Sequence, residues 1–247
     1  MTFAPEAGSQ RLRDVINKKV TEEDLLRTAE RAFQRGWRHL KLYFMIGLPT
    51  ESDEDVDAIA DLVRKVQQVG RQARGGRVEV NVSVATFVPK PDTPFQWLPM
   101  EDLTVVGARQ ARLRRALRGH DFSLSWHTPH SSLLEAALCR GDRRLGRVIE
   151  RAWAAGARFD AWDEHFRDSL WEEAFRAEGL DPFSYSSRLR ESDEILPWDH
   201  ISAGVDRAYL WEEYQRAMRG ETTPDCREGC LDCGAHASFA LAACPPQ

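Results

Sequence analysis

The sequence of 247 residues contains no run of about 18 apolar residues, the length that a membrane-spanning helix needs. Its first residues, MTFAPEAGSQRLRD, also lack the charged and then apolar segments of a signal peptide. These two absences predict a cytoplasmic protein without a membrane partner. The formal net charge of −5 gives no general attraction to nucleic acid, and only the basic cluster ARLRRALR leaves that class of partner open.

Cysteine is scarce, but its five copies are unevenly distributed, and three of them form a C-x3-C-x2-C pattern. These are Cys226, Cys230 and Cys233, in the segment CREGCLDCG. Clustered thiolates are typical of zinc or iron–sulfur sites and not of a disulfide framework. Cys244 or His236 could supply a fourth ligand, so structural zinc and an auxiliary iron–sulfur cluster are both open. Disordered thiols are the next alternative, and a catalytic cluster is the least favoured because so little chain follows.

Apolar segments rich in β-branched residues alternate with helical patterns along the first part of the chain. Strands are expected at TFAP, HLKLYFMIG, VEVNVSVATFVP and DFSLSW, each of the first three followed by an apolar stripe at helical spacing. This order is the signature of parallel β/α units, so the fold class is α/β. Four strands are too few for a closed barrel. We therefore expect an incomplete (β/α) barrel, or one that a partner completes.

Capping residues delimit two of the expected helices. Thr21 is a predicted N-cap, supported by Asp24 three residues later, and Gly36 is a stop signal. Ser52 is the predicted cap of the next helix, in the segment ESDEDVDAIADLVRKVQQVG.

The pattern becomes helical and rich in aromatic residues after about residue 131. The aromatic side chains are predicted to pack between helices, and they are Trp153, Phe159, Trp162, Phe166, Trp171 and Phe175. The final helix should end at Gly220. Three regions follow: a partial barrel over residues 1–130, a mainly helical extension over 131–220 and a cysteine-rich metal-binding tail over 221–247.

Seven segments, in order along nearly the whole chain, resemble the C-terminal half of cobalamin-binding radical S-adenosylmethionine (radical SAM) proteins. The resemblance is to the fused subfamily with a cysteine-rich C-terminal extension, whose substrate is not settled. The segments are TFAPEAGSQRLRDVINK, MIGLPTES, FVPKPDTPFQW, CRGDRRLGRVIERAW, FDAWDEHF, ILPWDHI and CREGCLDCG. The resemblance implies a partial radical SAM barrel, and S-adenosylmethionine, a four-iron four-sulfur cluster and cobalamin as cofactors of the complete protein.

The same resemblance implies reductive cleavage of S-adenosylmethionine, with methyl transfer or a related alkylation as the outcome. The family's cobalamin domain and its first barrel strands, with the catalytic cluster loop, have no counterpart in this sequence. We therefore expect a fragment that is inactive alone, whose missing N-terminal half is part of the same protein or a separate chain. A non-catalytic metal-binding or interaction subunit is the alternative, and an RNA-modifying enzyme is a third possibility.

The segment PEAGS corresponds to the family's contacts with the ribose or amino-acid part of S-adenosylmethionine. Glu6 is the implied acceptor, because a carboxylate can accept two hydroxyl hydrogen bonds, and Gly8 would allow close approach of the backbone. Ser9 is the second candidate. The alternative is that this segment only caps the next helix, with Ser9 as N-cap.

The segment FMIGLPTES corresponds to the family's adenine contact. Ile46 would supply an apolar surface and Gly47 the space for the base. Glu51 stands four residues after Gly47, whereas the family's pattern places the glutamate three residues on, so a first-turn carboxylate that the helix dipole favours is an equal interpretation.

Two further stretches carry polar candidates. The proline loop FVPKPDTPFQW is expected to face substrate or cobalamin, with Lys90 either a ligand contact or a surface lysine. His127 and His130 supply two possible zinc ligands without a third, and Asp142 is expected to form a structural ion pair with Arg143 or Arg144.

Overall fold

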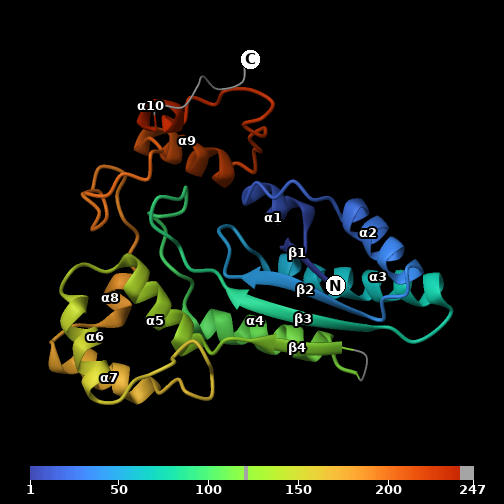
Figure 1. Ribbon diagram of the computed structural model, residues 1–247, viewed down its shortest axis with the longest axis horizontal. Coiled ribbons are helices and arrows are strands. Elements are labelled where there is room, and N and C mark those ends of the chain that lie inside the picture. The colour runs from blue at the N-terminus through green and yellow to red at the C-terminus, as the bar shows by residue number, and fades with distance from the viewer. Residues whose placement is uncertain (120–121, 240–247) are drawn as a thin grey trace. The chain divides into compact units, whose positions relative to one another are not determined.

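The computed structural model describes residues 1–119 and 122–239, which form two compact units (Figure 1). The first unit comprises residues 1–87, 101–127 and 217–222. The second comprises 88–100, 128–216 and the described residues from Thr223 onward. The segment 88–100 therefore belongs with the helical region, although the sequence places it inside the predicted barrel region.

The first unit is built on a parallel sheet of four strands in the order β1-β2-β3-β4 (Figure 1). The strands are β1 (Thr2–Glu6), β2 (His39–Ile46), β3 (Glu79–Thr86) and β4 (Phe122–Trp126). All three pairings are parallel, with Leu42 opposite Val82 and Val82 opposite Leu124. The predicted α/β class and its four strands are confirmed.

Four helices accompany these strands. They are α1 (Gln10–Val15), α2 (Glu22–Gln34), α3 (Asp53–Arg74) and α4 (Leu103–Ala116). The capping box of Thr21 and Asp24 is present at the start of α2, as predicted. The helix α3 passes through Gly70 and ends at Gly75, a C-cap in the left-handed conformation. A Cβ atom at Gly70 would lie 2.7 Å from the Phe33 ring, so this glycine serves helix packing and is no stop signal.

The sheet has one apolar and one polar face, because side chains alternate along each strand. The apolar face packs on α2, α3 and α4 and forms the core of this unit, including Leu42, Phe44, Val82 and Val84. The opposite face is half-buried or exposed, and it carries Lys41, Tyr43, Asn81, Ser83, Ser123 and Ser125. A parallel sheet is normally covered on both faces, so this polar face is one that a complete barrel would enclose.

The second unit is helical. It contains α5 (Pro129–Arg140), α6 (Leu145–Ala154), α7 (Asp168–Ala177), α8 (Pro182–Ser186), most of α9 (Arg207–Met218) and α10 (Ala235–Ser238). One of its cores includes Trp171 and Phe175, as predicted, with Phe166 partly buried against them. Along the described parts of the chain, no helix is both long and apolar enough to span a membrane.

Three of the aromatic residues predicted to be buried are exposed. Trp153, Phe159 and Trp162 are exposed by 60%, 68% and 54% respectively. Trp153 lies in the last turn of α6, and the other two lie between α6 and α7, where no helical face carries them inward. Their spacing imitates a helical stripe, but the chain between these helices is irregular.

The proline loop is a structural part of the second unit. Trp97 is fully buried in a core with Leu196, Trp198 and Leu210. Lys90 forms an ion pair with Glu135 of α5. The expectation that this loop faces substrate or cobalamin is therefore wrong for Trp97, because its side chain is enclosed by the helical core.

Candidate functional site

The carboxyl ends of β1, β2 and β3 meet at one edge of the sheet, and Glu6 is the last residue of β1. Its backbone has a φ of 68°, in the left-handed region that L-residues rarely adopt. The pairing with β2 shifts between Phe3 and Glu6, so the end of the strand turns out of the regular ladder. The Glu6 carboxylate is partly exposed, and Lys18 Nζ lies 3.4 Å from it. Glu6 is thus accessible at this edge.

The next two residues of the predicted ligand segment have structural roles. Ser9 is the N-cap of α1, and its hydroxyl accepts a hydrogen bond from the Leu12 amide at 3.1 Å. A Cβ atom at Gly8 would lie 2.2 Å from the amide nitrogen of Ile59. The close approach that Gly8 allows is therefore to the backbone of α3, and Ser9 acts as the helix cap that the alternative interpretation predicted.

A buried carboxylate, Asp55, ties this loop to the start of α3. It accepts hydrogen bonds from the Ser9 hydroxyl, from the Ser52 amide at 2.8 Å and from the Arg11 guanidinium. Burial alone would raise the pKa of Asp55, but these hydrogen bonds outweigh it and lower the pKa. The carboxylate therefore stays ionised and fixes the loop that carries Glu6.

A second network fixes the turn after β2. The Gly47 amide, at a φ of 82°, donates to the Glu51 carboxylate at 2.7 Å. Arg109 Nη1 lies 2.9 Å from Glu51 and 2.9 Å from Glu101. Glu51 precedes Ser52, the N-cap of α3, so the interpretation as a first-turn carboxylate is wrong. Its side chain closes the turn instead.

Burial sets the protonation of Glu51. Its side chain is only 1% exposed. This burial raises the pKa of Glu51 to about 7, although the Gly47 hydrogen bond and the charge of Arg109 act in the opposite direction. The Glu51 carboxyl therefore titrates near neutral pH, which is unusual for a glutamate with an arginine partner.

The two predicted adenine contacts are enclosed. Ile46 is 0% exposed and belongs to the core on the apolar face of the sheet. A Cβ atom at Gly47 would lie 3.1 Å from the Glu101 Cβ, so Glu101 fills the space beside this glycine. In this arrangement the Ile46 side chain has no exposed surface to offer a base, and the adenine contact stays a prediction.

The structure adds two residues to this edge that sequence reasoning missed. Thr86 is the last residue of β3 and pairs with Ile46, and its buried hydroxyl makes no hydrogen bond among the described residues. Glu51 Oε1 and Arg109 Nε are likewise buried and unsatisfied there. The position of Thr86 at a strand end was a usable signal, whereas nothing in the sequence of α4 distinguishes Arg109 from its other arginines.

The three cysteines of the tail, Cys226, Cys230 and Cys233, lie among the described residues. Cys226 is exposed, and Cys230 and Cys233 are half-buried. Cys230 Sγ lies 3.6 Å from an oxygen of Asp232. In the described ranges, no group of three or more His, Cys, Asp or Glu side chains is placed to hold a metal ion.

The other candidate metal ligands of the sequence are Cys244 and His236 near the thiols in sequence, and His127 and His130 earlier in the chain. Cys244 lies outside the described residues. His236 Nδ1 is buried without a hydrogen bond in the part of the chain that the structure describes. His130 Nδ1 lies 3.6 Å from Asp168, an ion-pair geometry, and Asp142 pairs with Arg144 as predicted.

Comparison with known proteins bears on the first unit most directly. Residues 1–63 match the sequence model of the Radical SAM superfamily. The uncharacterised protein MJ0966 of Methanocaldococcus jannaschii is 32% identical over 151 residues, which cover 61% of this chain and 32% of that protein. The chain thus spans less than two thirds of the length of this curated relative. No solved structure matches the chain. Together with the four parallel strands, the match makes the first unit a partial radical SAM barrel.

Proposed function

We propose that this chain supplies part of the S-adenosylmethionine site of a radical SAM enzyme, with Glu6 as its ribose or amino-acid contact. The observation that carries the proposal is the position of Glu6. It lies inside the matched segment, at the carboxyl end of a barrel strand, where ligands of such folds bind.

The geometry of Glu6 suits this role. Its backbone is held in a sparsely populated conformation, of the kind that is often retained at functional sites. A partly exposed carboxylate offers two oxygens to the hydroxyl groups of a ribose. Ser9 and Asp55 hold the following loop in place, so they act as positioning residues for this contact.

The catalytic iron–sulfur cluster does not fit the described residues, because no three cysteines converge there. We therefore assign no step through the cluster to this chain. In the proposal the remaining barrel strands and the cluster loop come from sequence outside these 247 residues, in the same or a separate chain. The polar sheet face defined above, including Lys41 and Tyr43, is the surface that those strands would enclose.

The reaction that we propose for the complete enzyme is methyl transfer or a related alkylation with cobalamin. This part rests on the resemblance of the segments quoted above. No described residue is assigned to cobalamin, and the proline loop, once the candidate for that contact, packs within the helical unit.

The test is calorimetric titration of the chain with S-adenosylmethionine. We expect measurable binding that Glu6→Gln weakens by about tenfold, because hydrogen bonds to a charged acceptor are lost. Glu22→Gln is the matched control, since Glu22 is also a partly exposed carboxylate paired with a lysine, Lys65. No binding, or equal binding by the Glu6 variant and the control, would contradict the proposal.

A non-catalytic interaction subunit is the second candidate, and the exposed aromatic residues favour it. Phe159 and Trp162 form an edge-to-face pair with centroids 6.0 Å apart, and both are largely exposed. Exposed aromatic pairs are common at protein interfaces. Absence of S-adenosylmethionine binding, together with self-association that Trp162→Ser abolishes in sedimentation, would favour this candidate.

A further inference from the structure

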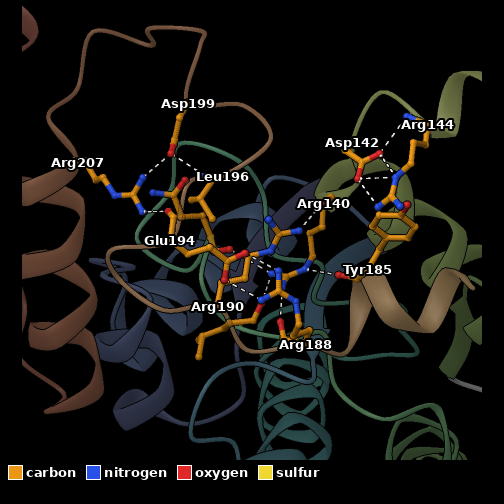
Figure 2. Close-up of polar contacts among 12 residues, drawn as sticks. Arg140, Asp142, Arg144, Tyr185, Arg188, Arg190, Glu194, Leu196, Asp199 and Arg207 are labelled. Carbon is orange, nitrogen blue, oxygen red and sulfur yellow. Dashed lines mark hydrogen bonds and ion pairs between the residues drawn. The ribbon is translucent and has the colours of Figure 1, made fainter.

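The second unit contains a pocket of about 280 Å³ that is lined by charged side chains. The polar groups around it come from the start of α6, from α8 and from the segment that follows α8 (Figure 2). They are Asp142, Arg144, Tyr185, Arg188, Arg190 and Glu194. This pocket is independent of the proposed S-adenosylmethionine contact, because its residues all belong to the second unit.

Two ion pairs at the pocket cancel most of its charge. Arg144 pairs with Asp142 at 2.7 Å, and Arg188 Nη1 donates to Glu194 at 2.7 Å. These arginines are more than half exposed, so they lie toward solvent. Each carboxylate is engaged by an arginine, which reduces its repulsion of an anion.

Arg190 also lines the pocket, and it belongs to neither of these two ion pairs. It is only 5% exposed, and within the described ranges it forms no ion pair with a carboxylate. Its Nη2 donates to the backbone carbonyl of Arg140, and its guanidinium lies 5.0 Å from the Trp198 ring centroid. Arg140, beside it, is buried and cationic as well (Figure 2). The floor of the pocket therefore carries surplus positive charge, which is costly without an anion.

Two buried hydrogen-bond donors of the pocket are also unsatisfied. Arg190 Nε makes no hydrogen bond among the described residues, and the Tyr185 hydroxyl, which lies beside the Arg144 guanidinium, donates its own proton to no partner there. Burial raises the pKa of the Tyr185 phenol and Asp142 acts in the same direction, which outweighs the opposite effect of Arg144, so the hydroxyl stays protonated as a donor. Arg13 in the first unit also has an unsatisfied Nε, so one such atom is not by itself a site. At Arg190 it coincides with a pocket and with a second unsatisfied donor.

We propose that this pocket binds an oxyanion, the phosphate or carboxylate group of a small ligand, through Arg190 Nε and the Tyr185 hydroxyl. Arg188 and Arg144 stand at its exposed side, each paired with a carboxylate. A guanidinium and a hydroxyl are complementary to the oxygens of either group, because both are donors that face acceptor-only atoms. The volume leaves room for the anionic group and a small attached moiety.

The experiment is calorimetric titration of the full chain with inorganic phosphate and, separately, with citrate, at constant ionic strength. Direct heats are needed because phosphate also stabilises folded proteins by exclusion from their surface. We expect Tyr185→Phe and Arg190→Lys each to weaken binding by about tenfold, through the loss of a hydrogen bond to a charged group. Preference for phosphate or for citrate then identifies which oxyanion the pocket takes.

Two controls separate binding from folding. Tyr185→Phe removes a buried hydroxyl whose proton is donated to no partner among the described residues, so its midpoint of unfolding without anion should stay close to that of the wild type. Arg151→Gln alters an exposed arginine of the same unit that pairs with Glu178, away from the pocket lining, and should leave the affinity unchanged. Absence of binding at millimolar phosphate and citrate would overturn the proposal. Equal affinity in all three variants would also overturn it, because the anion would then bind elsewhere.

Discussion

Two buried guanidinium clusters, one in each unit, are compensated in opposite ways. In the first unit Arg109 lies between two carboxylates, Glu51 and Glu101, each at 2.9 Å. In the second unit the guanidinium of Arg140 donates only to backbone carbonyls, and Arg190 beside it donates to one more. The first arrangement neutralises charge inside the fold, whereas the second keeps it.

This difference has a functional consequence. Backbone carbonyls satisfy hydrogen-bond donors but cancel no net charge, so a positive potential remains at the pocket beside Arg190. Around Arg109, by contrast, the carboxylates neutralise the buried charge, and one of them, Glu51, titrates near pH 7. We therefore expect an anion site in the second unit. In the first unit we expect a buried carboxyl, Glu51, whose ionisation changes near pH 7.

The largest expected effect is that of Arg140→Leu, which removes the guanidinium that donates to backbone carbonyls in the second unit. The guanidinium holds carbonyls of Gln96, Leu98, Tyr185 and Arg188, which would all be left unsatisfied. We expect a loss of about 4 kcal/mol in the free energy of unfolding, measured by tryptophan fluorescence in urea. The exposed ion pair altered by Arg151→Gln should cost at most about 1 kcal/mol. Similar losses of unfolding free energy in the two variants would show that these carbonyl contacts do not stabilise the fold.

An intermediate effect on stability is expected for Glu51→Gln, which removes one of the two carboxylates beside Arg109. The pKa of Glu51 rises from 4.5 to about 7 on folding, so folding favours the protonated form. Its contribution to stability is full below pH 4.5 and is lost as the pH rises through about 7. The wild type should therefore lose about 3 kcal/mol relative to the variant across this interval. Urea unfolding of both proteins at several pH values measures the difference, and a difference that does not change with pH would refute the assignment.

The smallest effects concern the loop that carries Glu6. Gly8→Ala would place a Cβ atom 2.2 Å from a backbone nitrogen of α3, and overpacking of this kind costs about 2 kcal/mol. Gly107→Ala in α4 meets nothing within 4 Å and should stabilise the protein by about 0.5–1 kcal/mol. Thermal unfolding distinguishes the two signs. If Gly8→Ala is neutral, the loop is free to move away from α3 and does not fix Glu6.

Much of the first unit could be predicted from the sequence because its signals are local. Alternating and β-branched segments defined the four strands, and Thr21 with Asp24 defined the start of α2. Errors arose where a residue type has two physical uses. A glutamate at a helix start can interact favourably with the helix dipole or close a turn, and Glu51 does the second by accepting a hydrogen bond from the Gly47 amide.

The second unit was less predictable for the same reason. An aromatic residue is buried only if its helix or loop directs the side chain toward a core. Trp171 is buried in this way, whereas Trp162 is exposed. The site residues divide similarly, since the resemblance of the segment PEAGS singled out Glu6, whereas the burial of Ile46 depends on which face α3 covers. The cysteine spacing was visible, but convergence of the thiols is a property of three-dimensional placement.

The sequence by itself determined the parallel β/α order, the helix caps and the edge at which Glu6 lies, because these depend on periodicity and on neighbours within a few residues. Only the tertiary structure decided that Arg109 is matched by carboxylates and that Arg190 is not. The reason is that charge compensation depends on groups far apart in sequence, such as Glu51 and Arg109, which only folding brings within reach of one another.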